Sequence, residues 1–255
     1  LKERTLAREE IICKIVNILE RLDYVYACWE GGAAAFNRVD EWSDIDLCVV
    51  VDDEKVSETF SAVENALASI SPIAQKLEFP QLPWPGVSQV FYKLKNASDY
   101  LLVDLAIFKL SSPEKLLTPE IHGNAVFHIN KSAKVEIPRL DRLGFDRKIR
   151  ERLERLTKRF ELFNVLVQKE INRGNLLEAI DLYHGLTLAT LVEALRIKHN
   201  PVHYDFRMRY VHYEFPSEIV SRLFNLYFVK NARDLQKKYE QATKWIAKTF
   251  SEIEE

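Results

Sequence analysis

The sequence has 255 residues, 47% of them hydrophobic and 29% charged, with a formal net charge of −2. Its 7 glycines are about 3% of the chain against about 7% in an average protein, which excludes repetitive fibres, Gly-rich linkers and low-complexity disorder. The balanced charge excludes a general attraction to nucleic acid or to anionic membranes, and the hydrophobic fraction is ample for a packed core.

Helix and strand signals alternate along the first half of the chain. Apolar residues at helical spacing predict helices, and β-branched or aromatic runs between turn residues predict strands. Thr5 is the predicted cap of the first helix. The predicted elements in chain order are a helix capped at 5 and apolar over 11–19, a strand at 24–29, a short helix at 33–36, a strand at 45–51, a helix at 56–70, a loop marked by Pro80, Pro83 and Pro85, and strands at 89–94 and 100–108.

The second half has a different texture, since its segments are long, charged and periodic with few strand signals. Four helices are predicted there, at 147–168, 176–197, 216–229 and 232–250. An α/β (α+β) unit with a mixed sheet followed by an all-α bundle is the fold class that this order indicates. The polar, aromatic and basic segment 200–210 is either a lid over a ligand or a packed loop.

The charge is divided between the same two halves. Residues 1–138 hold 14 Lys and Arg against 21 Asp and Glu, whereas residues 139–255 hold 22 against 17. An acidic unit followed by a basic unit indicates two domains with different roles. We therefore predict one domain at 1–138 and a second at 139–255.

The cysteines and the length of the apolar runs predict the cellular compartment of the protein. Cys13, Cys28 and Cys48 are odd in number, lack C-x-x-C spacing and lie in apolar runs, so we expect buried thiols in a reducing compartment. Charges interrupt every apolar stretch before the ~20 residues that a bilayer span needs. The six histidines show no metal-ligand spacing, so zinc is not expected. We predict a cytoplasmic protein that does not bind membranes.

An Asp-x-Asp pair opens the predicted strand at 45–51. Side chains at i and i+2 of a strand share a face, so Asp44 and Asp46 point the same way while Ile45, Leu47 and Val49 anchor the other face in the core. Two such carboxylates repel each other unless a cation lies between them. Mg²⁺ prefers these hard oxygen ligands. Alone, an Asp-x-Asp is more often a solvated strand end.

A glycine pair, Gly31-Gly32, lies between a predicted strand and a predicted helix, upstream of the carboxylates. Glycine lets the backbone turn tightly and approach a ligand closely, and the N–H groups at a helix start bind phosphate. A lone Gly-Gly is more often only a turn. Together with the carboxylate pair, however, it forms a coherent site for a metal–nucleoside triphosphate.

These residues resemble the signature of the DNA polymerase β-like nucleotidyltransferase superfamily. That signature is a glycine followed by Gly or Ser, a spacer near ten residues, and Asp-x-Asp or Asp-x-Glu on a hydrophobic strand. Gly31, Gly32, Asp44 and Asp46 occupy those places, and the run from Ser43 to Leu47 is similar to the form in small-substrate members. The resemblance implies nucleotide binding by Gly31, Gly32 and Ser43.

The family resemblance also implies a third carboxylate on a neighbouring strand. Asp104 fits, because it is the only charge in the apolar run 101–108 and a buried Asp without a partner is unfavourable. An Asp hydrogen-bonded at a sheet end is the alternative. The implied metal ligands and catalytic residues are Asp44, Asp46 and Asp104, with Mg²⁺ or Mn²⁺ as cofactor.

The sequence departs from the family at one place. Many members have Ser after the first glycine and an Arg soon after, whereas this chain has Gly32 and Ala33. Arg38 or the basic second half is a candidate source of that charge.

The resemblance extends to small-molecule adenylyltransferases of the aminoglycoside type, which have a C-terminal helical domain. It implies a catalytic domain at 1–138, a bundle at 139–255 on the acceptor side, and transfer of a nucleoside monophosphate to a hydroxyl of a small molecule. AMP from ATP is the favoured group. Glu178 and Asp181, on the predicted helix at 176–197, are acceptor-side candidates, with a solvated polar face as the alternative.

Two other functions stay open. One is a nucleotidyltransferase that modifies RNA or protein, as in toxin–antitoxin pairs, although nucleic acid is the less favoured partner because the basic run 139–159 interleaves both signs of charge. The other is a regulatory protein that binds nucleotide without turnover.

Overall fold

The computed structural model describes residues 5–79, 84–131 and 134–254. It divides into two compact units, Leu1–Leu140 and Asp141–Glu255, each with its own hydrophobic core. Of the prolines expected to mark a loop, Pro80 and Pro83 lie outside the described residues. Within the described part of the chain, no helix is both long and apolar enough to cross a bilayer.

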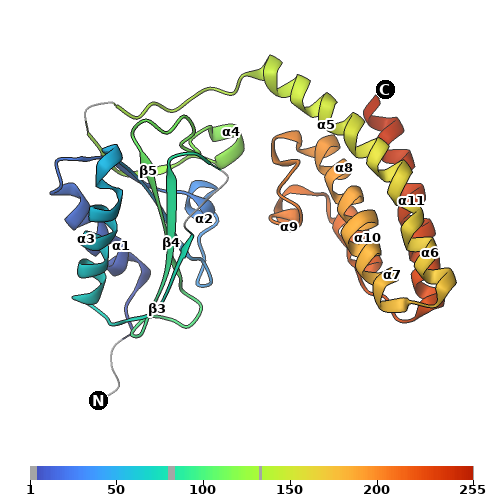
Figure 1. Cartoon of the computed structure of the whole chain (residues 1–255), viewed down its shortest axis with the longest axis horizontal. Coiled ribbons are helices and arrows are strands. Elements are labelled where there is room, and N and C mark those ends of the chain that lie inside the picture. Colours follow the sequence, from blue (N-terminus) through green and yellow to red (C-terminus); the bar gives the residue numbers. More distant parts are fainter. Residues whose placement is uncertain (1–4, 80–83, 132–133, 255) are drawn as a thin grey trace. The chain divides into compact units, whose positions relative to one another are not determined.

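The first unit is built on a six-stranded mixed sheet (Figure 1). The strands β2 and β5 are parallel, and every other neighbouring pair is antiparallel. The predicted α/β unit with a mixed sheet is therefore confirmed. In spatial order the strands are β3 (Ile73–Phe79), β4 (Val87–Leu94), β5 (Val103–Lys109), β2 (Ile45–Val51), β1 (Val25–Glu30) and β6 (Val126–Asn130).

Two helices, α1 (Arg8–Glu20) and α3 (Val56–Ala68), cover one face of this sheet (Figure 1). The side chains of β2 alternate between the two faces of the sheet. Ile45, Leu47 and Val49 face the two helices, since they are buried in the same core as residues of α1 and α3. Asp46 therefore lies on the opposite face. The short helices of this unit are α2 (Gly32–Ala35), the 3₁₀ turn Asp53–Lys55 and α4 (Pro119–His122).

Several local predictions were wrong at the edges of elements. Ala7, not Thr5, is the N-cap of α1, and the Glu10 carboxylate accepts the Ala7 N–H at 2.9 Å. The strand predicted at 100–108 is β5, which begins at Val103. Cys13 is exposed on α1, contrary to the expectation of three buried thiols, because it points away from the apolar stripe of that helix.

Two strands, β3 and β6, were not predicted. Both lie at the edges of the sheet, and most of their side chains are exposed. An edge strand needs no buried face along its whole length, so its sequence does not alternate clearly between apolar and polar residues.

The second unit is all-α, as predicted. A helix was expected to run through 147–168, but it breaks at Asn164, whose buried side chain donates to Tyr239 Oη at 3.0 Å and accepts from Thr187 Oγ1 at 2.7 Å. The elements are α5 (Arg142–Phe163), α6 (Val165–Arg173), α7 (Leu176–Leu182), the π-helical turn Tyr183–Leu188, α8 (Ala189–His199), the 3₁₀ turn Pro201–His203, α9 (Val211–Glu214), α10 (Ser217–Tyr227) and α11 (Ala232–Glu254).

The segment after α8 is held by a buried cation. The Arg196 guanidinium is fully buried, forms an ion pair with Glu214 at 2.7 Å and donates to the carbonyls of Arg207 and Arg209. Both Arg207 and Tyr210 have positive φ, a conformation that L side chains rarely adopt. The buried guanidinium therefore fixes the backbone of a loop whose own sequence does not favour its shape.

Candidate active site

The sheet brings two of the predicted carboxylates opposite each other. β2 and β5 run parallel in a register that pairs Asp46 with Asp104, so both side chains lie on the face away from α1 and α3. Asp44 lies one residue before β2, and its Oδ1 accepts the N–H of Leu102 at 2.9 Å. All three residues thus lie at the start of two neighbouring strands.

The environment of Asp104 favours its neutral form. The pKa of Asp104 is raised to about 7, mainly by burial and less by the charges of Asp46 and Asp44, while a hydrogen bond from Gln89 opposes the shift. Gln89 Nε2 donates to both carboxylate oxygens of Asp104, at 2.7 and 2.9 Å. Gln89 was missed in the sequence. Its place in a predicted strand, between the apolar residues Val87 and Val90, was a usable signal.

The donor set suits a hard divalent cation, because all three side chains are carboxylates. They are not gathered into a ready-made cluster: among the described residues no group of three or more His, Cys, Asp or Glu is arranged to hold a metal. The amide of Gln89 instead satisfies Asp104, and the Leu102 N–H satisfies one oxygen of Asp44.

The glycine pair is joined directly to Asp46. The N–H of Gly31 donates to the Asp46 carbonyl at 2.9 Å. Gly32 has φ +50°, and a Cβ there would lie 1.9 Å from Asp46 Oδ2. A serine at this position would have to displace the carboxylate. The following N–H groups form the first turn of α2, where a helix has no internal partners for them.

Ser43, predicted to bind nucleotide, shapes the loop before β2. Its Oγ donates to Asp40 Oδ1 at 2.7 Å and accepts the Asp40 N–H at 2.9 Å. The next residue back, Trp42, is 58% exposed and meets the 66% exposed Tyr100 edge to face, with ring centroids 5.0 Å apart. This aromatic pair therefore belongs to the two segments that lead into Asp44 and Asp104.

A second charged group, also missed in the sequence, holds the site from the helix side. Glu30 is 5% exposed, forms an ion pair with Arg8 and contacts His128 Nε2 at 2.9 Å. Arg8 Nη2 also donates to the Asp44 carbonyl at 3.2 Å. The first residue of α1 thus connects the strand end before Gly31 with the backbone of Asp44. The acidic residue directly before the glycine pair was the available signal.

The other candidates are Arg38 in the first unit and Glu178 and Asp181 in the second. Arg38 follows α2, and its guanidinium lies over the Phe36 ring at 5.0 Å from the centroid. Glu178 and Asp181 are exposed on α7, in the second unit, so their role as acceptor-side residues stays a prediction.

No protein-family model matches the chain, and no curated protein matches it in sequence. Three solved structures are similar to it over most of its length. An aminoglycoside 6-adenyltransferase from Bacillus subtilis has 12% identity and a TM-score of 0.39, covering 97% of this chain and 90% of that one. A spectinomycin adenyltransferase from Enterococcus faecialis, with ATP and spectinomycin, has 14% identity and a TM-score of 0.37, covering 98% and 100%.

The third is a STING-associated CdnE c-di-GMP synthase from Capnocytophaga granulosa, with 15% identity and a TM-score of 0.32, covering 96% of this chain and 79% of that one. All three TM-scores are below 0.5, and the function proposed below therefore rests on the geometry of the carboxylates.

Substituting the two glycines separately tests the contact with Asp46. Gly32→Ala should lower the free energy of unfolding by about 1–2 kcal/mol, since an L residue is strained at that backbone conformation and its Cβ collides with the carboxylate. Gly31→Ala is the matched control, because a Cβ there meets nothing within 4 Å and the loss should stay under about 0.5 kcal/mol. Urea unfolding of the full chain measures both, and equal losses would contradict the contact.

Asp104 should make the stability of the metal-free protein fall as the pH rises. Its folded pKa of about 7 lies above the unfolded value of 3.8, so ionisation penalises the folded state between these two pH values and fully above the higher one. Asp104→Asn should remove a loss of about 3 kcal/mol between pH 4.5 and pH 8. Unfolding in EDTA at both pH values measures it, with the exposed Asp23→Asn as control; an unchanged pH dependence would refute the assignment.

Removing Arg8 should leave a buried charge without its ionic partner. Arg8→Met should lower the free energy of unfolding by about 2 kcal/mol or more, whereas Arg21→Met, on the exposed end of the same helix, should stay within about 0.5 kcal/mol. Adding Glu30→Gln to Arg8→Met should recover part of the loss, because the uncompensated charge is gone. A purely additive double variant would show that the pair is not coupled.

Proposed function

We propose that this protein is a metal-dependent nucleotidyltransferase that moves a nucleoside monophosphate, with AMP from ATP as the favoured group, to a hydroxyl of a small molecule. The observation that carries the proposal is the pairing of Asp46 with Asp104 across parallel strands, with Asp44 held beside them. These carboxylates lie on the face that α1 and α3 leave uncovered. The family resemblance of the sequence motif agrees with this arrangement.

In the proposed reaction the acceptor oxygen bonds to the α-phosphorus, and the bond between the α-phosphorus and the bridging oxygen breaks. Pyrophosphate leaves with the electrons of that bond, and the hydroxyl proton passes to a carboxylate. Mg²⁺ or Mn²⁺ held by Asp44, Asp46 and Asp104 would supply positive charge for the phosphates and for the leaving pyrophosphate.

Asp104 is the residue we assign to the proton. A general base works best when its pKa is near the working pH, and in the metal-free protein burial and the charges of Asp46 and Asp44 raise the pKa of Asp104 to about 7. Gln89 orients both oxygens of Asp104 and favours the ionised form that accepts a proton.

The turn after β1 is the proposed phosphate side of the site. Gly32 contacts the Asp46 carboxylate without a side chain between them, so the first-turn N–H groups of α2 start next to a proposed metal ligand. Ser43 is proposed to contact nucleotide from the loop before β2. Glu178 and Asp181 of the helical unit remain proposed acceptor-side residues.

Calorimetry with Mg–ATP tests the site. Asp46→Asn and Asp44→Asn should each weaken Mg–ATP binding by about tenfold or more, because a neutral amide replaces a charged ligand. The exposed Asp23→Asn should bind as the wild type does. If Asp46→Asn and the wild type bind Mg–ATP equally, the site is wrong.

Labelled ATP with a panel of acceptors tests turnover. Hydroxylated small molecules, RNA and protein are each incubated with [α-³²P]ATP, and Asp104→Asn should lower product formation by about 10²-fold or more because it cannot accept the proton. Label transferred to RNA or protein instead would identify the alternative acceptor class. Mg–ATP binding without product from any acceptor would favour a nucleotide-binding protein without turnover.

A further inference from the structure

The uncovered face of the sheet continues past the carboxylates into an apolar groove. Asp104 pairs across the antiparallel ladder with Phe91 of β4, which in turn pairs with Leu77 of β3. Directly opposed residues share a face, so Asp46, Asp104, Phe91 and Leu77 form one row across four strands. With strands about 4.8 Å apart, the apolar side chains begin one strand away from Asp104.

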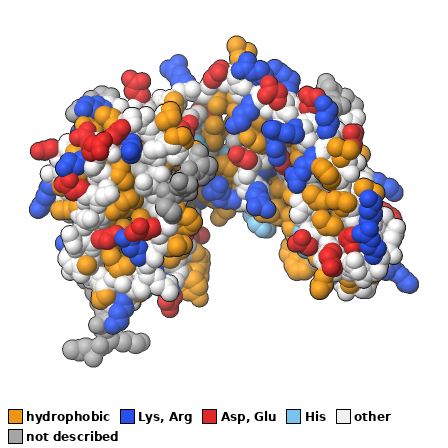
Figure 2. All heavy atoms as spheres, in the orientation of Figure 1, with side chains coloured by type: hydrophobic (Ala, Val, Ile, Leu, Met, Phe, Trp, Pro, Cys, Tyr) orange, Lys and Arg blue, Asp and Glu red, His pale blue; other side chains and the backbone are white. Residues whose placement is uncertain are grey.

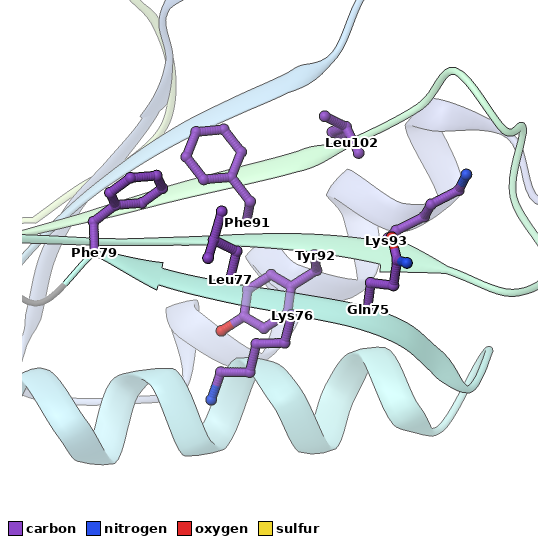
Figure 3. Close-up of a pocket in the computed structure, with 8 residues that line it drawn as sticks. All are labelled: Gln75, Lys76, Leu77, Phe79, Phe91, Tyr92, Lys93 and Leu102. Carbon is purple, nitrogen blue, oxygen red and sulfur yellow. The ribbon is translucent and has the colours of Figure 1, made fainter.

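A groove of about 580 Å³ lies over these strands (Figure 3). Phe79 and Phe91 meet edge to face in it, with ring centroids 5.7 Å apart, and Leu77 and Phe79 are 58% and 39% exposed. Figure 3 shows Lys76 and Tyr92 pointing to the opposite side, toward a helix, where both contact Glu64 of α3. The open side of the groove is therefore mainly apolar.

Leu102 is a second connection between the groove and the carboxylates, besides the row from Asp46 to Leu77. Its side chain lines the groove, and its N–H donates to Asp44 at 2.9 Å. A ligand whose reacting atom lies at Asp104 can therefore also contact Phe91, Leu102 and Leu77 on the same face of the sheet.

The side chains that line the groove determine which chemical class of ligand can bind there. The residues that line it include Gln75, Lys76 and Lys93 but no Asp or Glu within the described parts of the chain. The one carboxylate bound to Lys93 is Asp99, 89% exposed, at 3.0 Å. Lys76 is paired with Glu64 and Glu78, so both lysines of the groove have a carboxylate partner. The groove itself therefore offers mainly apolar surface, and an aromatic or alkyl group gains by burying it.

We infer that this groove binds the apolar part of the acceptor, and that the acceptor is an aromatic or alkyl alcohol rather than a polycationic sugar. This inference rests on the proposed function, in which the acceptor hydroxyl is at Asp104, gives its proton to that carboxylate, and receives the nucleoside monophosphate as pyrophosphate leaves. Figure 2 shows hydrophobic side chains interspersed with charged ones on both units in this view.

2-Naphthol, an aromatic alcohol, is the probe for the test. Saturation-transfer NMR with the full chain should detect binding, and Leu77→Gln should weaken it by about tenfold, the effect of losing roughly one buried apolar side chain from a contact. Because Leu77 is exposed on an edge strand, this variant keeps its fold. Val126→Gln is the matched control, since Val126 is also exposed, on the opposite edge strand β6, and it should bind 2-naphthol as the wild type does.

Two further measurements separate this inference from other occupants of the groove. Mg–ATP affinity should be the same in Leu77→Gln and wild type; a loss there would make the groove a nucleobase site and overturn the inference. Sedimentation should give the same mass for both; a wild-type dimer that Leu77→Gln dissociates would make the groove an interface between copies and also overturn it.

Activity completes the test. With [α-³²P]ATP, the wild type should label 2-naphthol more than kanamycin, a polycationic sugar, and Leu77→Gln should lose about tenfold of the 2-naphthol product. Equal 2-naphthol binding by Leu77→Gln and wild type would refute the inference while Mg–ATP binding at Asp46 still supported the proposed function. Absence of Mg–ATP binding in the wild type would refute the proposed function, and the acceptor assignment with it.

Discussion

Asp46 and Asp104 occupy directly opposed positions on two parallel strands, and Asp44 lies just ahead of them. Like-charged carboxylates on neighbouring strands repel one another, and the burial of Asp104 further disfavours its ionised form. The protein meets that repulsion in two ways that the structure shows: the pKa of Asp104 rises to about 7, and the Gln89 amide donates to both of its oxygens. A divalent cation would be a third.

The surrounding backbone holds this arrangement through contacts that reach it from separate parts of the chain. Gly31 donates to the Asp46 carbonyl, Leu102 donates to the Asp44 carboxylate, and Arg8 donates to the Asp44 carbonyl. Gly32 leaves room for the Asp46 side chain. Because each contact comes from a different element, the position of the carboxylates depends on the assembled sheet and α1, and not on the loop before β2 alone.

Prediction from the sequence succeeded where a pattern was long and local. Alternation at Ile45, Leu47 and Val49 identified the buried face of β2, and sustained helical spacing identified an all-α second unit. It failed where the deciding contact came from elsewhere. The periodic helix is interrupted at Asn164, whose carbonyl accepts from Tyr239 Oη at 3.0 Å, and the edge strands β3 and β6 owe their pairing to their neighbours.

By itself, the sequence determined the character of each segment: which face of β2 is apolar, that Asp44 and Asp46 follow a glycine pair, and that the second half is helical. Only the tertiary structure decided that Asp104 lies opposite Asp46, that Gln89 and Arg8 reach the carboxylates, and that Phe91 and Leu77 extend the same row. The physical reason is that periodicity records how each segment meets the core. The order and register of strands depend instead on which apolar faces are buried together, and residues as far apart as Asp44 and Leu102 become neighbours only then.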